Sequence, residues 1–161
     1  MGVPAVVDWQ ERRVTAEEAV SVVKPGDKVF VGTACSTPLS LVEALQRRIV
    51  PGVTLVHFIT TGADAGGSAQ SPYRHVVFYV GRDERALRES ARVEYLPLSL
   101  ADVPRLFRNG QLPLDVAMLQ VAPPDPDGTC SLGISVDVNK AAALTADRHR
   151  RGQPGDAPHR R

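Results

Sequence analysis

Residues 28–38 read Lys28-Val29-Phe30-Val31-Gly32-Thr33-Ala34-Cys35-Ser36-Thr37-Pro38. The first half is a short apolar strand that ends at Gly32, and the second half starts a helix, with Pro38 suited to its first turn. Further strands are predicted at 53–59, 75–80, 93–98 and 114–121. Because helices separate these strands, the sequence predicts an α/β fold: a mainly parallel sheet with helices on both faces. The last strand is the most apolar and is predicted to be central.

Capping and turn residues mark the ends of the helices. Thr15-Ala16-Glu17-Glu18 is a capping box, in which the Thr15 hydroxyl accepts a hydrogen bond from a free backbone N–H and Glu18 reaches back. The helix that it opens is predicted to end at Pro25-Gly26. Other helices are predicted at 83–92, from 99–102 to a cap at 109–110, and at 137–146, with a long Gly/Ala/Ser-rich loop at 60–73.

The composition is typical of one soluble globular domain. The chain has 161 residues, 43% of them hydrophobic and 23% charged, which is enough for a real core. A net charge of +1 argues against nucleic acid as the main partner. No apolar run is long enough to span a bilayer, and no secretory signal is visible. Cys35 and Cys130 suggest no disulfide framework, so we expect a cytoplasmic protein.

Two loops are candidate binding sites because each follows a predicted strand, at the carboxyl edge of the sheet where open α/β folds bind ligands. The first is 31–38, whose helix start could attract a carboxylate or phosphate. It lacks the glycines of a dinucleotide fingerprint and the Gly-Lys-Ser/Thr of a P-loop. The second, 123–133, has prolines and an Asp-Gly turn that fix its path. The competing interpretation of the first loop is a plain connection between strand and helix, and that of the second loop is a tight turn. Gly32 and Gly133 are predicted to lie where a side chain is costly.

Other reactive side chains point to no chemistry by themselves. Cys35 is more typical of a packed cysteine than of a nucleophile, since no partner base is evident. His57 and His75 lie on predicted strands without metal-site spacing and are expected to be hydrogen-bonded. No glutamate falls in either candidate loop. We therefore expect no metal site and no catalytic residue in this chain.

Several segments resemble the amino-terminal domain of the acetyl-CoA hydrolase/transferase family, which includes acetate and 4-hydroxybutyrate CoA-transferases. The similarity covers nearly everything from Val14 to Ala146, in the family's order. The segments that carry it are 24–33, 74–81, 104–107 and 112–117, and most closely 123–140, with Cys130-Ser131-Leu132-Gly133 and Ser135-Val136-Asp137. The resemblance implies the CoA-transferase-like α/β fold, which is related to that of sugar-phosphate isomerases and deaminases.

The resemblance also implies a reaction. Family members transfer CoA between carboxylic acids or hydrolyse acyl-CoA, through a glutamate that attacks the thioester while backbone N–H groups stabilise the oxyanion. That glutamate lies in a second, carboxy-terminal domain that the sequence does not contain. The resemblance assigns substrate binding to Gly32, Thr33 and Ala34 in the first loop and to Ser131, Leu132 and Gly133 in the second. It implies no cofactor beyond the coenzyme A thioester that is the substrate.

The last residues differ in composition from the rest. From Arg148 onward, five arginines stand against one aspartate, and no aliphatic side chain is larger than alanine. We therefore predict a domain at 1–146 and a disordered tail at 147–161. Codons for this tail, read with a shift of one base, permit Ile-Val-Ile-Ala-Glu-Val-Asn-Pro-Glu-Met-Pro-Arg-Thr, which resembles the family's continuation. We infer a frameshift near Asp147.

Three functions are compatible with these features. The first is a truncated CoA-transferase or acyl-CoA hydrolase, inactive alone, whose complete form binds an acyl-CoA and an acetate-like carboxylate. The second is a non-catalytic half-domain or interaction module that pairs with a separate carboxy-terminal half. The third is a sugar-phosphate isomerase or deaminase, which would need an acid/base pair that neither loop has. The sequence predicts neither a nucleic-acid nor a membrane partner, and it leaves homo-oligomer formation open.

Overall fold

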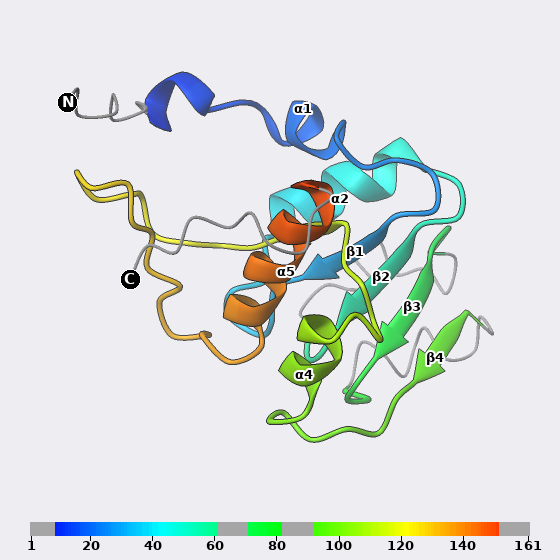
Figure 1. Ribbon diagram of the computed structural model, residues 1–161. Coiled ribbons are helices and arrows are strands. Elements are labelled where there is room, and N and C mark those ends of the chain that lie inside the picture. The colour runs from blue at the N-terminus through cyan, green and yellow to red at the C-terminus, as the bar shows by residue number, and fades with distance from the viewer. Residues whose placement is uncertain (1–8, 61–70, 82–91, 152–161) are drawn as a thin grey trace.

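The fold is built on one parallel sheet (Figure 1). The computed structural model describes residues 9–60, 71–81 and 92–151. Its strands are β1 (Lys28–Val31), β2 (Thr54–His57), β3 (Arg74–Val77), β4 (Val93–Tyr95) and β5 (Val116–Met118). Its helices are the 3-10 helix η1 (Trp9–Arg12), α1 (Ala16–Val20), α2 (Leu39–Arg48), α4 (Val103–Arg108) and α5 (Asn139–Arg151).

The strands follow the order β4-β3-β2-β1-β5, and every neighbouring pair is parallel. This confirms the predicted mainly parallel α/β sheet. The predicted central position of the last strand is wrong, because β5 pairs with β1 alone among the described strands and β2 lies in the middle. The apolar character of β5 comes instead from packing, since Leu114 and Met118 are buried on its two sides.

The helices α1 and α2 cover one face of the sheet. Val20 of α1 and Val42 and Leu45 of α2 pack against inward-facing residues of β1 and β2, among them Val29 and Leu55. Tyr73 is the largest side chain in this layer, 1% exposed, and its hydroxyl donates to the Leu45 carbonyl at 2.6 Å. Burial therefore holds α2 to the strands, and the Tyr73 hydrogen bond fixes its end.

The helices α4 and α5 cover the opposite face, nearer to the viewer in Figure 1. Phe107 of α4 makes edge-on contacts with Phe30 and Phe78, at ring-centre distances of 5.7 and 6.2 Å. Val138 and Ala142, at the start of α5 and within it, are fully buried in the same cluster. Successive strand residues point to opposite faces, so β1 contributes Val29 and Val31 to one layer and Phe30 to the other.

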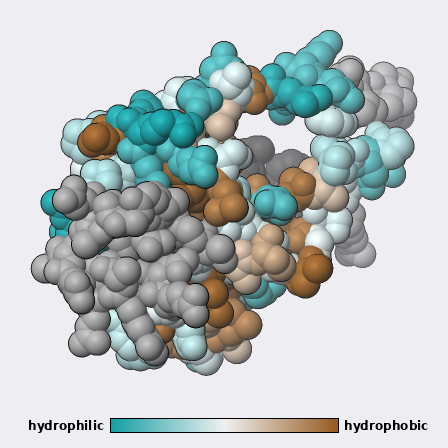
Figure 2. Space-filling view, turned by 180° about the vertical axis from the view of Figure 1, so that it is seen from behind, coloured by the Kyte–Doolittle hydropathy of each residue, from teal (hydrophilic) through white to brown (hydrophobic). Residues whose placement is uncertain are grey.

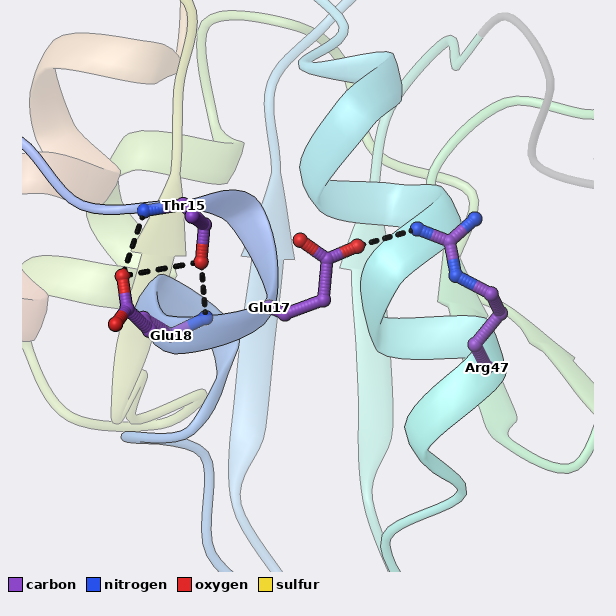
Figure 3. A network of polar contacts seen from close by, with 4 residues as sticks. All are labelled: Thr15, Glu17, Glu18 and Arg47. Atoms are coloured by element: carbon purple, nitrogen blue, oxygen red, sulfur yellow. Dashed lines mark hydrogen bonds and ion pairs between the residues drawn. The ribbon is translucent and has the colours of Figure 1, made fainter.

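The predicted capping box at Thr15 is confirmed (Figure 3). Thr15 Oγ1 accepts from the Glu18 N–H at 3.2 Å, and Glu18 Oε2 accepts from the Thr15 N–H at 2.9 Å. The hydrogen bonds from the Thr15 backbone and hydroxyl lower the pKa of Glu18. Arg47 of α2 forms an ion pair with Glu17 at 2.7 Å, which ties α1 to α2 at the surface.

Several predicted boundaries shift by a few residues. Pro38 is the N-cap of α2 rather than part of its first turn. Of the helix predicted at 83–92, only the last position is among the described residues. Most of the loop predicted at 60–73 also lies outside them. The last helix begins at Asn139 and continues to Arg151, beyond the predicted domain boundary at 146, because arginine and histidine are compatible with helix. Within the described residues, no helix is long and apolar enough to span a bilayer.

Candidate functional site

The first candidate loop begins where β1 ends, at a tightly packed glycine. A Cβ on Gly32 would lie 2.5 Å from the Ser36 carbonyl oxygen and 3.3 Å from that of Met118. Only glycine fits between these two backbone segments, so the predicted cost of a side chain at position 32 is confirmed. The close approach lets the loop fold back on itself, and the Thr37 hydroxyl donates to the carbonyls of Gly32 and Ala34 at 3.1 and 2.8 Å.

Ala34 has a left-handed backbone conformation, with φ of 47°. Its N–H donates to the Ile59 carbonyl at 2.6 Å, and Ala34 forms a parallel bridge with Thr60 just beyond β2. A left-handed conformation is unfavourable for alanine and persists only where surrounding contacts hold it. The end of β2 therefore fixes the shape of the first loop.

Residues 135–139, at the start of α5, hold the other side of the first loop. The Thr33 hydroxyl donates to Asp137 Oδ2 at 2.7 Å, and the Thr33 N–H donates to Asn139 Oδ1 at 3.3 Å. Asn139 Nδ2 donates to the Ser135 carbonyl at 2.6 Å, and Cys35 Sγ lies 3.2 Å from Ser135 Oγ. These bonds bring together segments that are far apart in the sequence, at the carboxyl edge of the sheet.

The first loop is held by Ser135, Asp137 and Asn139, which the sequence analysis did not select as site residues. Of the six residues assigned to substrate binding, Gly32, Thr33 and Ala34 lie at this junction. Ser131, Leu132 and Gly133 lie earlier, on a mostly exposed loop. There the Ala122 N–H donates to the Ser131 carbonyl, and the Gly133 N–H donates to Ser131 Oγ. Asp137 and Asn139 were recognisable as polar capping residues at a helix start. Substrate contact by any of the six stays a prediction.

A side chain is also costly at Gly133, as predicted, but for a different reason from that at Gly32. Its φ is +63°, which favours glycine, while nothing lies within 4 Å of the position of a Cβ. Backbone conformation is therefore the constraint at position 133, and space is the constraint at position 32.

The backbone N–H groups of the first loop are mostly occupied. Those of Gly32, Thr33 and Ala34 donate to Met118, Asn139 and Ile59. These three residues can therefore shape a substrate site but do not offer it N–H donors. The described residues supply an acceptor for each backbone N–H group between Gly32 and Leu39 except that of Cys35. Cys35 is also exposed.

The two strand histidines bind each other. His57 Nε2 lies 3.1 Å from His75 Nδ1, and His75 Nε2 lies 2.8 Å from Ser71 Oγ. Each histidine is 1% exposed, and the two rings meet edge to face. The expectation that these histidines are hydrogen-bonded is confirmed, and the arrangement cross-links β2 and β3 inside the core.

The surface beside the loops exposes large hydrophobic side chains. Between the second loop and α5, Ile134 is 91% exposed and Val136 is 46% exposed. Ile59 and Tyr79, beyond the ends of β2 and β3, are also exposed. Seen from behind the sheet, hydrophobic residues reach the surface in several places (Figure 2). None of the described glutamates lies in the loops, since they fall in η1, α1, α2 and β4. Among the described residues, this edge therefore offers hydrophobic surface and no glutamate nucleophile.

Comparisons with known proteins agree with this geometry. The family model of the acetyl-CoA hydrolase/transferase N-terminal domain matches residues 5–149. The 4-hydroxybutyrate coenzyme A transferase of Clostridium kluyveri is 37% identical over 86% of this chain and 33% of its own length. The succinyl-CoA:acetate/propanoyl-CoA:succinate CoA transferase of Fasciola hepatica is 33% identical over 81% of this chain and 28% of its own. The chain thus spans about a third of the length of the curated relatives that it matches.

Solved structures show the same arrangement. RipA from Yersinia pestis superposes with a TM-score of 0.76 at 25% identity, over 86% of this chain and 35% of its own. The 4-hydroxybutyrate CoA-transferase of Porphyromonas gingivalis superposes with a TM-score of 0.62 at 32% identity, over 86% and 33%. The chain therefore belongs to the acetyl-CoA hydrolase/transferase family and has the fold of its amino-terminal domain.

Proposed function

We propose that this chain forms one wall of an acyl-CoA:carboxylate CoA-transferase or acyl-CoA hydrolase site, and that a carboxy-terminal half supplies the nucleophilic glutamate. The observation that carries the proposal is the junction of Thr33 with Asp137 and Asn139, which joins the first loop to the start of α5 at the carboxyl edge of the sheet. In open α/β sheets this edge is where substrates bind. The acyl-accepting carboxylate is of the small kind that the names of the relatives carry, such as acetate, succinate or 4-hydroxybutyrate.

The residues of the junction have distinct roles in this proposal. Gly32 is buried between the carbonyls of Ser36 and Met118 and shapes the loop, whereas Ala34 is small and half-buried, so the acyl group can approach the backbone there. The Thr33 side chain, 2% exposed, holds the loop in place rather than contacting substrate. Cys35 is exposed, the described residues supply no acceptor for its N–H, and this N–H is the proposed donor to the thioester oxygen.

The isolated chain should be inactive under this proposal. Covalent catalysis by a carboxylate needs a glutamate at the reacting carbon, and the described glutamates lie on other elements. The purified protein is assayed with acetyl-CoA alone, and separately with succinyl-CoA plus acetate. Turnover above about 1 per second in either assay would contradict the need for a second half.

The exposed hydrophobic residues support a second form of the proposal, in which the other half is a separate chain. Ile134, 91% exposed, is the kind of side chain that an interface covers. Size-exclusion chromatography is run on the chain alone and with the carboxy-terminal half of a relative. We expect self-association alone, and a one-to-one complex with CoA-transferase activity when the half is added. A monomer that ignores the added half would favour an independent module instead.

A further inference from the structure

A row of basic side chains crosses the amino edge of the sheet, opposite the loops described above. In the parallel register, Lys28 of β1 pairs with Thr54 of β2, and Thr54 pairs with Arg74 of β3. His75 pairs with Val93, so Arg92 is level with Arg74. Adjacent strands lie about 4.8 Å apart, so the row brings three cations within roughly 15 Å.

The row lies on the face that α4 and α5 cover. Lys28, Thr54 and Arg74 are each two residues before a member of that layer, namely Phe30, Val56 and Val76. Side chains two apart on a strand share a face. The helices cover the carboxyl part of this face, where Phe107 packs on Phe30 and Phe78. The amino part, near β3 and β4, forms a cleft among the described residues.

This cleft has a volume of about 1110 Å³. Its rim includes Lys28, Arg74 and Arg92, and its wall is hydrophobic, with Val76, Leu96, Leu98, Leu106 and Leu112. The volume is slightly above the usual range of small-molecule sites, about 300–1,000 Å³, and such sites pair a mostly apolar lining with a few polar groups. Leu106 and Leu112 place the apolar wall beside α4, next to the row of cations.

The cations of the rim are available to a ligand. Among the described residues, no carboxylate lies within ion-pair distance of Lys28, Arg74 or Arg92. Arg92 donates to the Ser71 carbonyl at 2.7 Å, which orients its guanidinium and leaves other donors. Glu94 also lines the cleft, so the rim holds three positive groups and one negative group.

We propose that this cleft binds a small amphipathic anion: a carboxylate held by the row Lys28, Arg74 and Arg92, with an unbranched apolar chain along the leucines. An arginine fork matches the two oxygens of a carboxylate, and an apolar chain removes the leucine side chains from water. An uncharged lipid would leave the cations unused, and a short anion would leave the leucines exposed. The site is at the edge of the sheet opposite the Thr33–Asp137 junction and does not rest on the function proposed above.

The test is a titration of the ¹⁵N-labelled 161-residue chain with octanoate below its micelle concentration, followed by NMR. We expect saturable shifts at the amides of Val76, Leu96 and Leu112, with a dissociation constant of about 1 mM, as for an efficient ligand of this size. The amides of Thr33 and Asn139 should not move. Acetate and 1-octanol, which each lack one half of the ligand, should bind at least about tenfold more weakly.

Charge variants identify the head-group site. Arg74→Gln should weaken octanoate binding about tenfold, the effect of one charge-assisted hydrogen bond. Arg108→Gln removes an exposed arginine of α4 that does not line the cleft and should leave affinity unchanged. Glu94→Gln should leave affinity unchanged or raise it. If Arg74→Gln fails to fold by circular dichroism, Lys28→Gln takes its place.

Several results would overturn the proposal: no saturable binding below about 10 mM, equal affinity for 1-octanol, equal effects of Arg74→Gln and Arg108→Gln, or shifts centred on Thr33. Because octanoate binding is measured without turnover, its failure leaves the proposed transferase function untouched. Loss of the transferase proposal likewise leaves the binding result standing.

Discussion

The Thr33 hydroxyl donates a hydrogen bond to Asp137 Oδ2 at 2.7 Å, across 104 positions of sequence. Thr33 is buried at the end of β1, and Asp137 is exposed just before α5. Asp137 Oδ1 also accepts from the N–H of Asn139 at 3.2 Å, so one carboxylate caps α5 and anchors the first loop. The candidate site thus depends on a helix start that follows it by about a hundred residues in the chain.

Replacing Thr33 by valine should lower the free energy of unfolding by about 1 kcal/mol, because the shape is kept while a hydrogen bond to a charged group is lost. Urea unfolding of the purified variant measures the change. Thr33→Ser keeps the hydroxyl and is the matched control. If both variants are equally stable, the hydrogen bond does not hold the loop.

Gly32→Ala should be more damaging, at about 3 kcal/mol, because the new methyl group would lie 2.5 Å from the Ser36 carbonyl oxygen. Gly133→Ala should cost only about 1 kcal/mol, since space is open there and only the positive φ is unfavourable. Thermal unfolding of the two variants separates close packing from backbone strain. A larger loss at Gly133 than at Gly32 would reverse this interpretation.

Tyr73 should make stability depend on alkaline pH. Burial raises the pKa of its phenol, because the charged phenolate would lose hydration. A raised folded-state pKa means that the stabilisation is complete below the unfolded value of about 10 and is lost as pH rises through the folded value. Tyr73→Phe removes the titration. The stability difference between the wild-type chain and Tyr73→Phe, measured by urea unfolding from pH 8 to 11, should therefore shrink above about pH 10. A constant difference would show that the pKa of the phenol is the same in the folded and unfolded states.

The composition of residues 147–161 predicts a dispensable tail, whereas α5 extends to Arg151. Limited proteolysis with trypsin distinguishes a dispensable tail from a packed end of α5, since trypsin cleaves after Arg148, Arg150 and Arg151. Early cleavage there, leaving a stable fragment that ends near Ala146, is the expected result. Persistence of an intact arginine cluster, while the rest of the chain is cut, would show that the helix is packed through Arg151.

The frameshift hypothesis has a direct test in the gene. Sequencing the codons from Ala146 to Arg161 should reveal a one-base change, after which the shifted frame reads through to Asn-Pro-Glu-Met-Pro-Arg-Thr. Codons that exclude this reading, above all those for Gln153, Asp156 and His159, would remove the hypothesis.

The order of the elements and their parallel pairing could be predicted because both depend on local patterns. Apolar runs such as Val29–Val31, separated by capped helices, force crossover connections, and crossovers make neighbouring strands parallel. The capping box at Thr15 was equally readable, because its partners are three residues apart. The two candidate loops followed from the same reasoning, since strand ends mark the binding edge of the sheet.

What the sequence determined by itself was therefore local: strands, helix starts, and glycines such as Gly32 at tight junctions. Only the tertiary structure decided that β5 is the last of the described strands in the sheet order, that His57 meets His75, and that Asp137 and Asn139 reach the first loop. The same holds for the row of Lys28, Arg74 and Arg92, which depends on strand register. The physical reason is that these relationships join residues that are distant in the chain. The alternation of residues along a strand sets the face of the sheet on which a side chain lies. Only the packing of helices against the sheet brings a distant residue into contact with that side chain.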